Sequence, residues 1–385
     1  MAAVFDDRIL DDAQALAQAD PGAMLAAIAT AGAQVRLALL QNSEAPEAMR
    51  ALAADGRPRA IVVCGMGGSA VAGDVLVAAT TARSPIPVMT YRGYSLPAWV
   101  GPLDVVITVS CSGRTEETLS VFDEAARRGC RLVAVGSAGS PLADRAEQAG
   151  APLIPVDAHG RSPRASLWAL ATPVLLIADA LGIGTFGAGL LNVVADALDA
   201  EALLSGPVVS FDQNPAKTLA YALSGTVPLA WGTSPLTGVA AYRFSTQAAE
   251  NADLPVIHGE LPEPNHNQVV MFDGPFGAGR AEAGVEDLFV DRVESASENL
   301  SLALVLLHDV DAHPQVRRRA QVSTDLANAR SIAVHELEAL EDEPLARFGR
   351  LVARIDFATA YLALGSGIDP SAIDPITELK ERIAR

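Results

Sequence analysis

From residue 60 to residue 156 the chain alternates short apolar runs with helical segments, and this alternation limits the fold more than any other feature. The apolar runs contain few polar residues, which is typical of strands covered on both faces, as in a parallel sheet. Helices between successive strands form βαβ units, so we expect a doubly wound α/β sheet of five strands. The expected strands are AIVVCG (60–65), PVMTY (87–91), DVVITVS (104–110), RLVAVG (131–136) and APLIPV (151–156).

The same pattern begins again in the second half of the chain. The segment TVPLAWGTSPLTGVA, which starts at residue 226, repeats the design of AIVVCGMGGSAVAGD, which starts at residue 60. In each, an apolar strand ends in glycine, a loop of small residues carries a hydroxyl, and a helix follows, so we expect an internal duplication of one α/β domain. Further strands are expected at PVIHG (255–259), QVVMFDG (268–274), DLFVDRV (287–293) and LALVLL (302–307).

The length of 385 residues also favours two domains, because a single core rarely grows so large. We expect two tandem doubly wound parallel-sheet domains with flanking N- and C-terminal helices. Residues 1–57 are expected to form helices that pack on the first domain, residues 58–190 to form that domain, and residues 205–385 to form the second domain with the C-terminal helices.

The net charge of −18 excludes general binding to nucleic acids or anionic membranes, which would repel the chain. The most apolar long window, residues 174–191, contains Asp179 and several glycines, so we expect a core helix there and no membrane span. The three cysteines form no CxxC pair and leave one thiol over, and the acidic N-terminus lacks the basic region of a signal peptide. We therefore expect a reduced, cytoplasmic protein.

The loop GMGGSA (65–70) formally matches the G-x-G-x-x-A fingerprint of dinucleotide-binding folds. That fingerprint also expects a carboxylate about 20 residues later, at the end of the second strand. The segment PVMTYRGYS (87–95) contains none, although Arg92 could instead take a 2′-phosphate. A nicotinamide-dependent oxidoreductase therefore stays open as an alternative.

A phosphate site explains the same loop and a second one. Ser69 opens a helix after the first strand, while Ser110, Ser112 and Thr115 open another helix after the third, with Gly113 allowing a tight turn. Helix N-termini present unpaired N–H groups at their positive ends, and parallel strands bring such loops to one edge of the sheet. The alternative is that Thr115 only caps its helix and the serines fill a turn.

The residues also carry a family resemblance. GMGGSAVAGD (65–74) together with SCSGRTEET (110–118) resembles the paired signature of sugar isomerase (SIS) domains, which bind phosphosugars. RFSTQAAENADLPV (243–256), LPEPNHNQVV (261–270) and DPITELKERI (374–383) are similar to the bifunctional phosphoglucose/phosphomannose isomerases of the phosphoglucose isomerase superfamily. The resemblance covers roughly residues 60–385.

This resemblance implies an aldose–ketose isomerase that converts glucose 6-phosphate and mannose 6-phosphate to fructose 6-phosphate through a cis-enediol, without a cofactor. It also implies a homodimer in which His266 reaches the neighbouring subunit's site. The implied roles are phosphate binding by Ser69, Ser110, Ser112 and Thr115, close backbone contacts at Gly67 and Gly68, a position beside the reacting carbons for Arg164, proton transfer by Glu250, ring opening by His266, and assistance to His266 by Lys380.

The local sequence is compatible with these roles. Glu250 follows a ligand-facing loop on a helix, and one carboxylate can take a proton from C2 and return it to C1. His266 lies between two asparagines, as expected of a loop imidazole held by polar neighbours. Lysine occurs only at positions 217 and 380, and Lys380, unlike an arginine, can approach neutrality. Arg164 could stabilise an enediolate, and Arg161 is a nearby arginine that could be mistaken for it.

Other interpretations remain at this point. Glu250 could be a solvated helix carboxylate and Lys380 a surface lysine. A non-catalytic SIS protein that only binds phosphosugars would carry the same two loops. The histidines and cysteines show no HxxxH or CxxC spacing, so no metal is expected. The preference between glucose and mannose epimers stays open, as does the effect of Arg114, where relatives tend to have asparagine.

Overall fold

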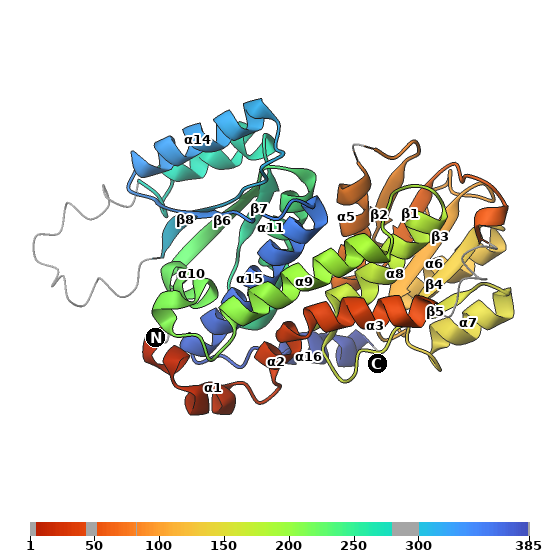
Figure 1. Cartoon of the computed structure of the whole chain (residues 1–385), viewed down its shortest axis with the longest axis horizontal. Coiled ribbons are helices and arrows are strands. Elements are labelled where there is room, and N and C mark those ends of the chain that lie inside the picture. The colour runs from red at the N-terminus through yellow and green to blue at the C-terminus, as the bar shows by residue number, and fades with distance from the viewer. Residues whose placement is uncertain (1–4, 44–51, 82, 279–299, 384–385) are drawn as a thin grey trace, which may run out of the picture. The chain divides into compact units, whose positions relative to one another are not determined.

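The computed structural model describes residues 5–43, 52–81, 83–278 and 300–383 (Figure 1). It divides into two compact units. We call residues 30–199 with 342–346 the first unit, and residues 1–29, 200–341 and 347–385 the second unit.

The first unit is built on a five-stranded sheet in which all neighbouring strands are parallel. The strand order is β2-β1-β3-β4-β5, so the chain moves outward from β1 to β2 and then returns to the other side of β1. The expected doubly wound sheet and its five strands are confirmed. The strands are β1 (Ile61–Cys64), β2 (Val88–Tyr91), β3 (Val105–Ser110), β4 (Arg131–Gly136) and β5 (Leu153–Pro155).

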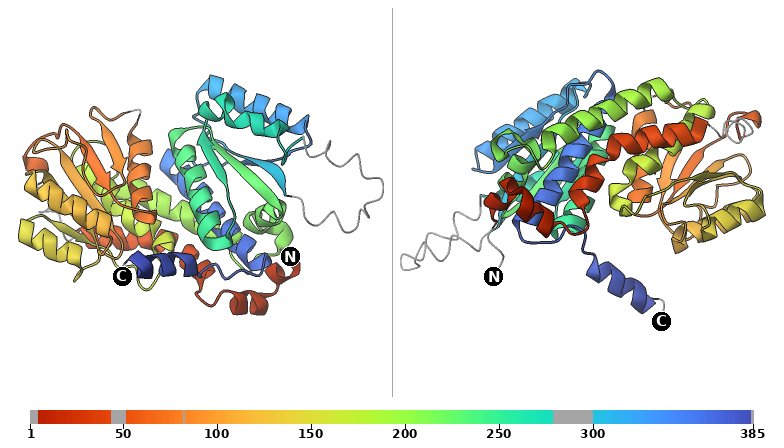
Figure 2. Two further views of the ribbon diagram at one scale, coloured as in Figure 1. Left: turned by 180° about the vertical axis from the view of Figure 1, so that it is seen from behind. Right: turned by 60° about the horizontal axis from the view of Figure 1, so that its bottom comes forward.

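Helices cover both faces of this sheet (Figure 2). Helices α6 (Glu116–Arg127) and α7 (Pro141–Ala149) lie against one face, and α5 (Gly68–Thr80) and α8 (Leu167–Ala180) against the other. Helix α3 (Ala31–Ser43) packs on the outside of α8, while α9 (Ala188–Ser205) and the short 3-10 helix η2 (Pro163–Ala165) complete the elements of this part of the chain.

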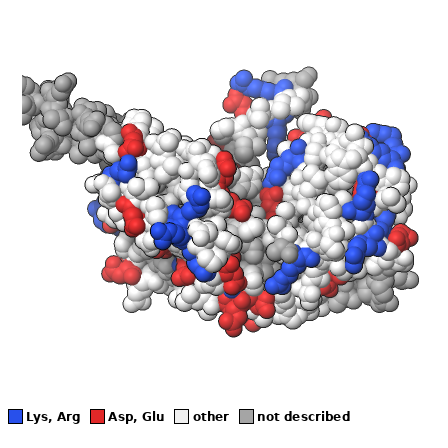
Figure 3. All heavy atoms as spheres, turned by 90° about the horizontal axis from the view of Figure 1, so that it is seen from above, with Lys and Arg blue, Asp and Glu red and all other residues white. Residues whose placement is uncertain are grey.

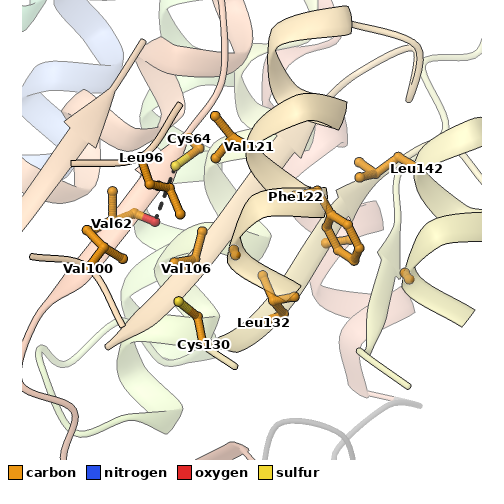
Figure 4. Packing of buried hydrophobic residues seen from close by; sticks show 13 residues of the cluster. Val62, Cys64, Leu96, Val100, Val106, Val121, Phe122, Cys130, Leu132 and Leu142 are labelled. Carbon is orange, nitrogen blue, oxygen red and sulfur yellow. Dashed lines mark hydrogen bonds between the residues drawn. The ribbon is translucent and has the colours of Figure 1, made fainter. Parts of the chain in front are cut away.

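Burial on both faces explains why the strand sequences are almost entirely apolar. All four residues of β1 are buried, and Val62, Val106 of β3 and Phe122 of α6 belong to one buried cluster (Figure 4). Cys64 belongs to the same cluster, and burial raises the pKa of its thiol. All three cysteines are free. The sheet is therefore held by apolar packing from two sides.

The second unit contains a smaller parallel sheet with the order β7-β6-β8-β9. Helix α11 (Pro235–Ala252) lies on one face together with α15 (Pro344–Gly365), and α14 (Pro314–Asn328) packs on the other face (Figure 1). The expectation of two tandem doubly wound sheets is thereby confirmed. The strands are β6 (Thr226–Gly232), β7 (Ile257–Glu260), β8 (Ser301–Leu307) and β9 (Ala333–Leu337).

The remaining described elements are helical. They are η1 (Asp7–Asp11), α1 (Ala13–Ala19), α2 (Met24–Ala29), η3 (Phe211–Gln213), α10 (Pro215–Leu223), η4 (Glu263–His266), η5 (Gln268–Asp273) and α16 (Asp374–Ile383). No helix among the described residues is long and apolar enough to cross a membrane. On the face drawn in Figure 3, acidic and basic side chains are interspersed.

One expected strand is wrong. Residues 268–273 form the 3-10 helix η5, not a strand, because the side chain of Asn267 accepts the N–H of Gln268 at 2.6 Å and starts a turn. Phe272 then stacks on Trp231 with ring centroids 5.7 Å apart and is buried, whereas Val270 of the same short helix is exposed. The expected strand at 287–293 lies outside the described residues.

A buried lysine links the N-terminal segment to the rest of the second unit by hydrogen bonds. Lys217 is fully buried, and its ammonium donates to Asp11 Oδ1 at 3.2 Å, Pro207 O at 3.1 Å and Val209 O at 2.6 Å. These three acceptors match the three N–H donors of an ammonium group. Tyr361 faces the same nitrogen, which lies 5.7 Å from its ring centroid. Lys217 is therefore a fully bonded structural cation.

We expect Lys217→Met to lower the free energy of unfolding by about 2–4 kcal/mol, because two buried carbonyls and Asp11 lose their donor. Lys380→Met is the matched control, since Lys380 lies exposed on α16 and its loss should change stability by less than about 0.5 kcal/mol. Thermal and urea unfolding of both variants check this. Equal transitions for the two variants would contradict the structural role of Lys217.

Candidate active site

The order in which strands are added to the first sheet reverses between β1 and β3. This switch point is where a ligand is expected to bind. The chain leaves β1 toward β2 and leaves β3 toward β4, so the loops after β1 and β3 diverge from neighbouring strand ends. Open parallel sheets bind ligands at such a switch point, outside the carboxyl ends of the strands. Both hydroxyl-rich loops predicted from the sequence lie there.

The loop after β1 leaves the start of α5 open to an anion. Gly67 occupies the N-cap position with φ +52°, and no side chain caps the helix. The first turn of α5 contains no acidic residue, so its positive end is not neutralised. A Cβ on Gly68 would approach the carbonyl oxygen of Pro163 to 3.1 Å, which explains why a glycine is needed. Ser69, the next residue, is buried.

The loop after β3 is joined to this helix start by a hydrogen bond. The N–H of Cys111 donates to Ser69 Oγ at 3.3 Å. Ser110 Oγ and Thr115 Oγ1 lie 3.0 Å apart, and Thr115 occupies the N-cap of α6 without a capping bond from its side chain. Thr115 therefore occupies the cap position, but its side chain is bonded to Ser110 and not to the helix amides. Ser112 does fill a turn, since its Oγ accepts the N–H of Arg114 at 3.2 Å.

Arg164 lies beside these loops in the short helix η2. Arg164 is only 5% exposed, and the preceding Pro163 lies against the Gly68 turn. The Cα of Arg164 would lie 3.7 Å from a Cβ added to Gly68, so a buried arginine lies beside the uncapped start of α5. Arg92, which could have held the 2′-phosphate of a dinucleotide, instead forms an ion pair with Asp74 of α5.

The corresponding switch point of the second sheet is closed by its own hydrogen bonds. There, Thr237 Oγ1 accepts the N–H groups of Thr233 and Ser234, both at 2.8 Å, and Ser234 Oγ accepts the N–H of Thr237 at 3.3 Å. The amides that an anion would use are thus already paired in a capping box. Asp309 follows β8 at this point and pairs with Arg347 at 3.1 Å.

Glu250 lies near the end of α11, a helix that is pinned by buried polar contacts. Arg243 pairs with Asp356 of α15 through two bonds of 2.9 and 2.6 Å, and Gln247 Nε2 donates to the same carboxylate at 3.0 Å. Asn251 Nδ2 donates to Thr359 Oγ1 at 3.0 Å. These contacts hold the helix that carries the partly buried Glu250. Asp356 could not be predicted from the sequence, because no local pattern relates it to Arg243.

His266 is exposed at the end of η4, and its neighbours hold the loop on both sides. Asn265 Nδ2 donates to Ser323 Oγ of α14 at 2.9 Å. Asn267 Nδ2 donates to Glu263 Oε1 at 2.8 Å, so the predicted framing by two asparagines is present. Lys380 lies exposed on α16, so Glu250, His266 and Lys380 come from three separate elements of the second unit. No three His, Cys, Asp or Glu residues in the described ranges could hold a metal ion.

Comparison with known proteins identifies the family of this chain. Residues 212–383 match the bacterial phospho-glucose isomerase C-terminal SIS domain. The bifunctional phosphoglucose/phosphomannose isomerase of Caldicellulosiruptor bescii is 30% identical over 331 residues, 84% of this chain and 89% of that protein. The chain belongs to the bifunctional phosphoglucose/phosphomannose isomerase family. The enzyme of the same name from Aquifex aeolicus is 30% identical over 329 residues, 85% of this chain and 91% of that protein.

A solved structure shows the same fold at lower identity. A glucose-6-phosphate isomerase from Chlamydia trachomatis superimposes with a TM-score of 0.63 at 13% identity, covering 100% of this chain and 86% of that one. The expected resemblance to this isomerase family and the SIS-type fold class are therefore confirmed. The roles of the individual site residues in the family member described here stay predictions.

We expect Gly113→Ala to disrupt the β3–α6 loop, because Gly113 has φ +64° and an added Cβ would lie 2.0 Å from Ser140 Oγ. Gly139→Ala is the matched control, since Gly139 has φ +65° but open space around the same position. Both variants carry the backbone strain of about 1 kcal/mol, and only Gly113→Ala adds the clash. Calorimetric titration with inorganic phosphate should show weaker binding for Gly113→Ala alone. Equal affinities in the two variants would refute the importance of this loop.

Proposed function

We propose that this protein interconverts glucose 6-phosphate and mannose 6-phosphate with fructose 6-phosphate. The observation that carries the proposal is the pair of hydroxyl loops joined by the Cys111–Ser69 hydrogen bond at an uncapped helix start. Its position is that of a phosphate site, and the chain belongs to an isomerase family. The two aldoses differ only at C2, and that difference disappears in the cis-enediol, so one site can serve both.

Proton transfer in this proposal needs one carboxylate and one stabilising cation. Glu250 takes the proton from C2 of the open-chain aldose, the C–H electron pair forms the C1–C2 double bond, and the negative charge moves to O1. Arg164 stabilises that oxyanion. Transfer of the O2 proton to O1 and return of the C2 proton to C1 then give the ketose, with no net gain or loss of electrons. His266, assisted by Lys380, transfers the proton that opens the sugar ring.

The same proposal assigns the phosphoryl group to the first unit. Ser69, Ser110, Ser112 and Thr115 donate hydroxyl hydrogen bonds, and the Gly67–Gly68 turn brings main-chain N–H groups close. We also propose a cytoplasmic protein, which fits its three free cysteines, and a homodimer in which His266 serves the neighbouring subunit's site.

We expect Glu250→Gln to bind fructose 6-phosphate with nearly unchanged affinity while turnover falls by about three to five orders of magnitude, because the amide cannot accept the C2 proton. Assays coupled to each aldose phosphate, with binding measured by calorimetry, check this on one preparation. Arg57→Gln, an exposed change at the amino end of β1, is the control and should keep full activity. Full turnover in Glu250→Gln would remove it as the base.

Mixing two inactive variants tests the proposed sharing of His266 between subunits. In a heterodimer of Glu250→Gln and His266→Ala, one site contains both defects and the other contains none. After subunit exchange at equal concentrations, activity should therefore recover to about a quarter of the wild-type value, because half the dimers then carry one intact site. Recovery is measured after mild denaturation and joint refolding. No recovery above the separate variants would show that His266 acts within its own subunit.

A further inference from the structure

Arg161 is a second arginine near the phosphate loops, and it has no role in the proposed reaction. It lies in the loop between β5 and η2, three residues before Arg164, and is partly buried. The sequence alone does not distinguish the roles of Arg161 and Arg164, which lie three residues apart. The surroundings of Arg161 in the structure are different from those of a structural arginine.

The guanidinium of Arg161 is poorly compensated. Its Nε is buried without a hydrogen-bond partner among the described residues, and Nη2 makes one long bond of 3.3 Å to the carbonyl of Asp157. The Asp157 carboxylate is already engaged, since it accepts the N–H of His159 at 2.7 Å and faces the His159 imidazole at 3.3 Å. Burial lowers the pKa of Arg161 despite the field of Asp157. A buried donor without an acceptor costs stability, so its presence needs an explanation.

The same segment lies against both phosphate loops. The charge of Arg161 opposes the rise that burial causes in the pKa of the Cys111 thiol, so Arg161 lies near Cys111, which stands between Ser110 and Ser112 in the β3–α6 loop. Pro163, two residues later, contacts the Gly68 turn of the β1–α5 loop. Ser162 Oγ, between them, is also buried and without a partner in the described part of the chain. Two adjacent residues of this segment thus each carry a buried polar atom without a partner among the described residues.

We propose that Arg161 is a further substrate-binding residue, whose guanidinium pairs with the phosphoryl group of the ligand. Hydroxyls and main-chain amides donate hydrogen bonds to a phosphate but carry no formal charge, and the chain as a whole is strongly acidic. A guanidinium binds phosphate oxygens through parallel N–H bonds, so the ligand supplies the acceptors that Arg161 lacks. This inference rests on the proposed function for the identity of the ligand, but binding of a phosphate can be measured without turnover.

A purely structural role predicts the opposite stability effect. If Arg161 held its loop in place, its removal would lower the melting temperature of the ligand-free protein. If it is kept for a ligand, removing a poorly compensated buried charge leaves the ligand-free protein as stable as before or more stable. The rise in melting temperature on adding ligand should then become smaller. A structural role therefore predicts a lower melting temperature without ligand, and a binding role predicts a lower affinity for the ligand.

The test compares full-length Arg161→Gln, Arg161→Lys and the control Arg57→Gln, which removes one exposed charge from the amino end of β1. Calorimetry with inorganic phosphate and with fructose 6-phosphate should show a loss of affinity of about ten- to a hundredfold for Arg161→Gln. Arg161→Lys should lose less, and Arg57→Gln should match the wild type. The ligand-free melting temperature of Arg161→Gln should not fall.

Each result decides the matter. Unchanged affinity of Arg161→Gln for both ligands, in a protein that still isomerises hexose phosphates, overturns this inference and leaves the proposed function intact. A lower ligand-free melting temperature with unchanged affinity assigns Arg161 to the structure alone. A wild-type protein that binds neither phosphate nor fructose 6-phosphate overturns the inference and the proposed function together.

Discussion

The hydrogen bond from the Cys111 amide to Ser69 Oγ is the contact on which the proposed phosphate site depends. Strands β1 and β3 are paired, and this bond adds a direct link between the β3–α6 loop and the start of α5. The neighbouring contacts support this one, since Ser137 Oγ donates to Cys111 O at 2.6 Å. Helix α6 begins with Glu116 and Glu117, whereas α5 has no acid in its first turn, so α5 offers the more positive terminus.

The two units show how one fold can serve two chemical purposes. In both sheets the strand order reverses between two adjacent strands. In the first sheet, helix α5 after this point begins without a side-chain cap. In the second, Ser234 and Thr237 pair with the amides that an anion would need, which stabilises α11 from its first turn. That helix carries Glu250 near its other end, where Asn251 and Gln247 are bonded to α15. A capped, pinned helix is better suited to hold a base than to receive a phosphate.

Sequence patterns could predict the layers but not the polar contacts across them. The strands of the first sheet were predictable because both of its faces are covered, which makes β1 and β3 continuous apolar runs. The strand predicted at 268–274 was wrong, because the periodicity of a short apolar segment does not distinguish a strand from a turn of helix. Strand β9 was missed, since its residues are mostly exposed or half-buried at the sheet edge. The pairing of Arg243 with Asp356 joins residues 113 positions apart, and no local pattern encodes it.

Three buried or partly buried cations differ in how the fold balances their charge. Lys217 is completely buried and meets three acceptors, so its charge is balanced by the fold itself. Arg243 is also buried, and two bonds to Asp356 balance it within the same unit. Arg161 is partly buried with an unpaired Nε, and its nearby carboxylate is bonded elsewhere. Burial alone does not separate these groups. The unpaired Nε distinguishes Arg161 from Lys217 and Arg243, and it is one reason why we propose a ligand for Arg161.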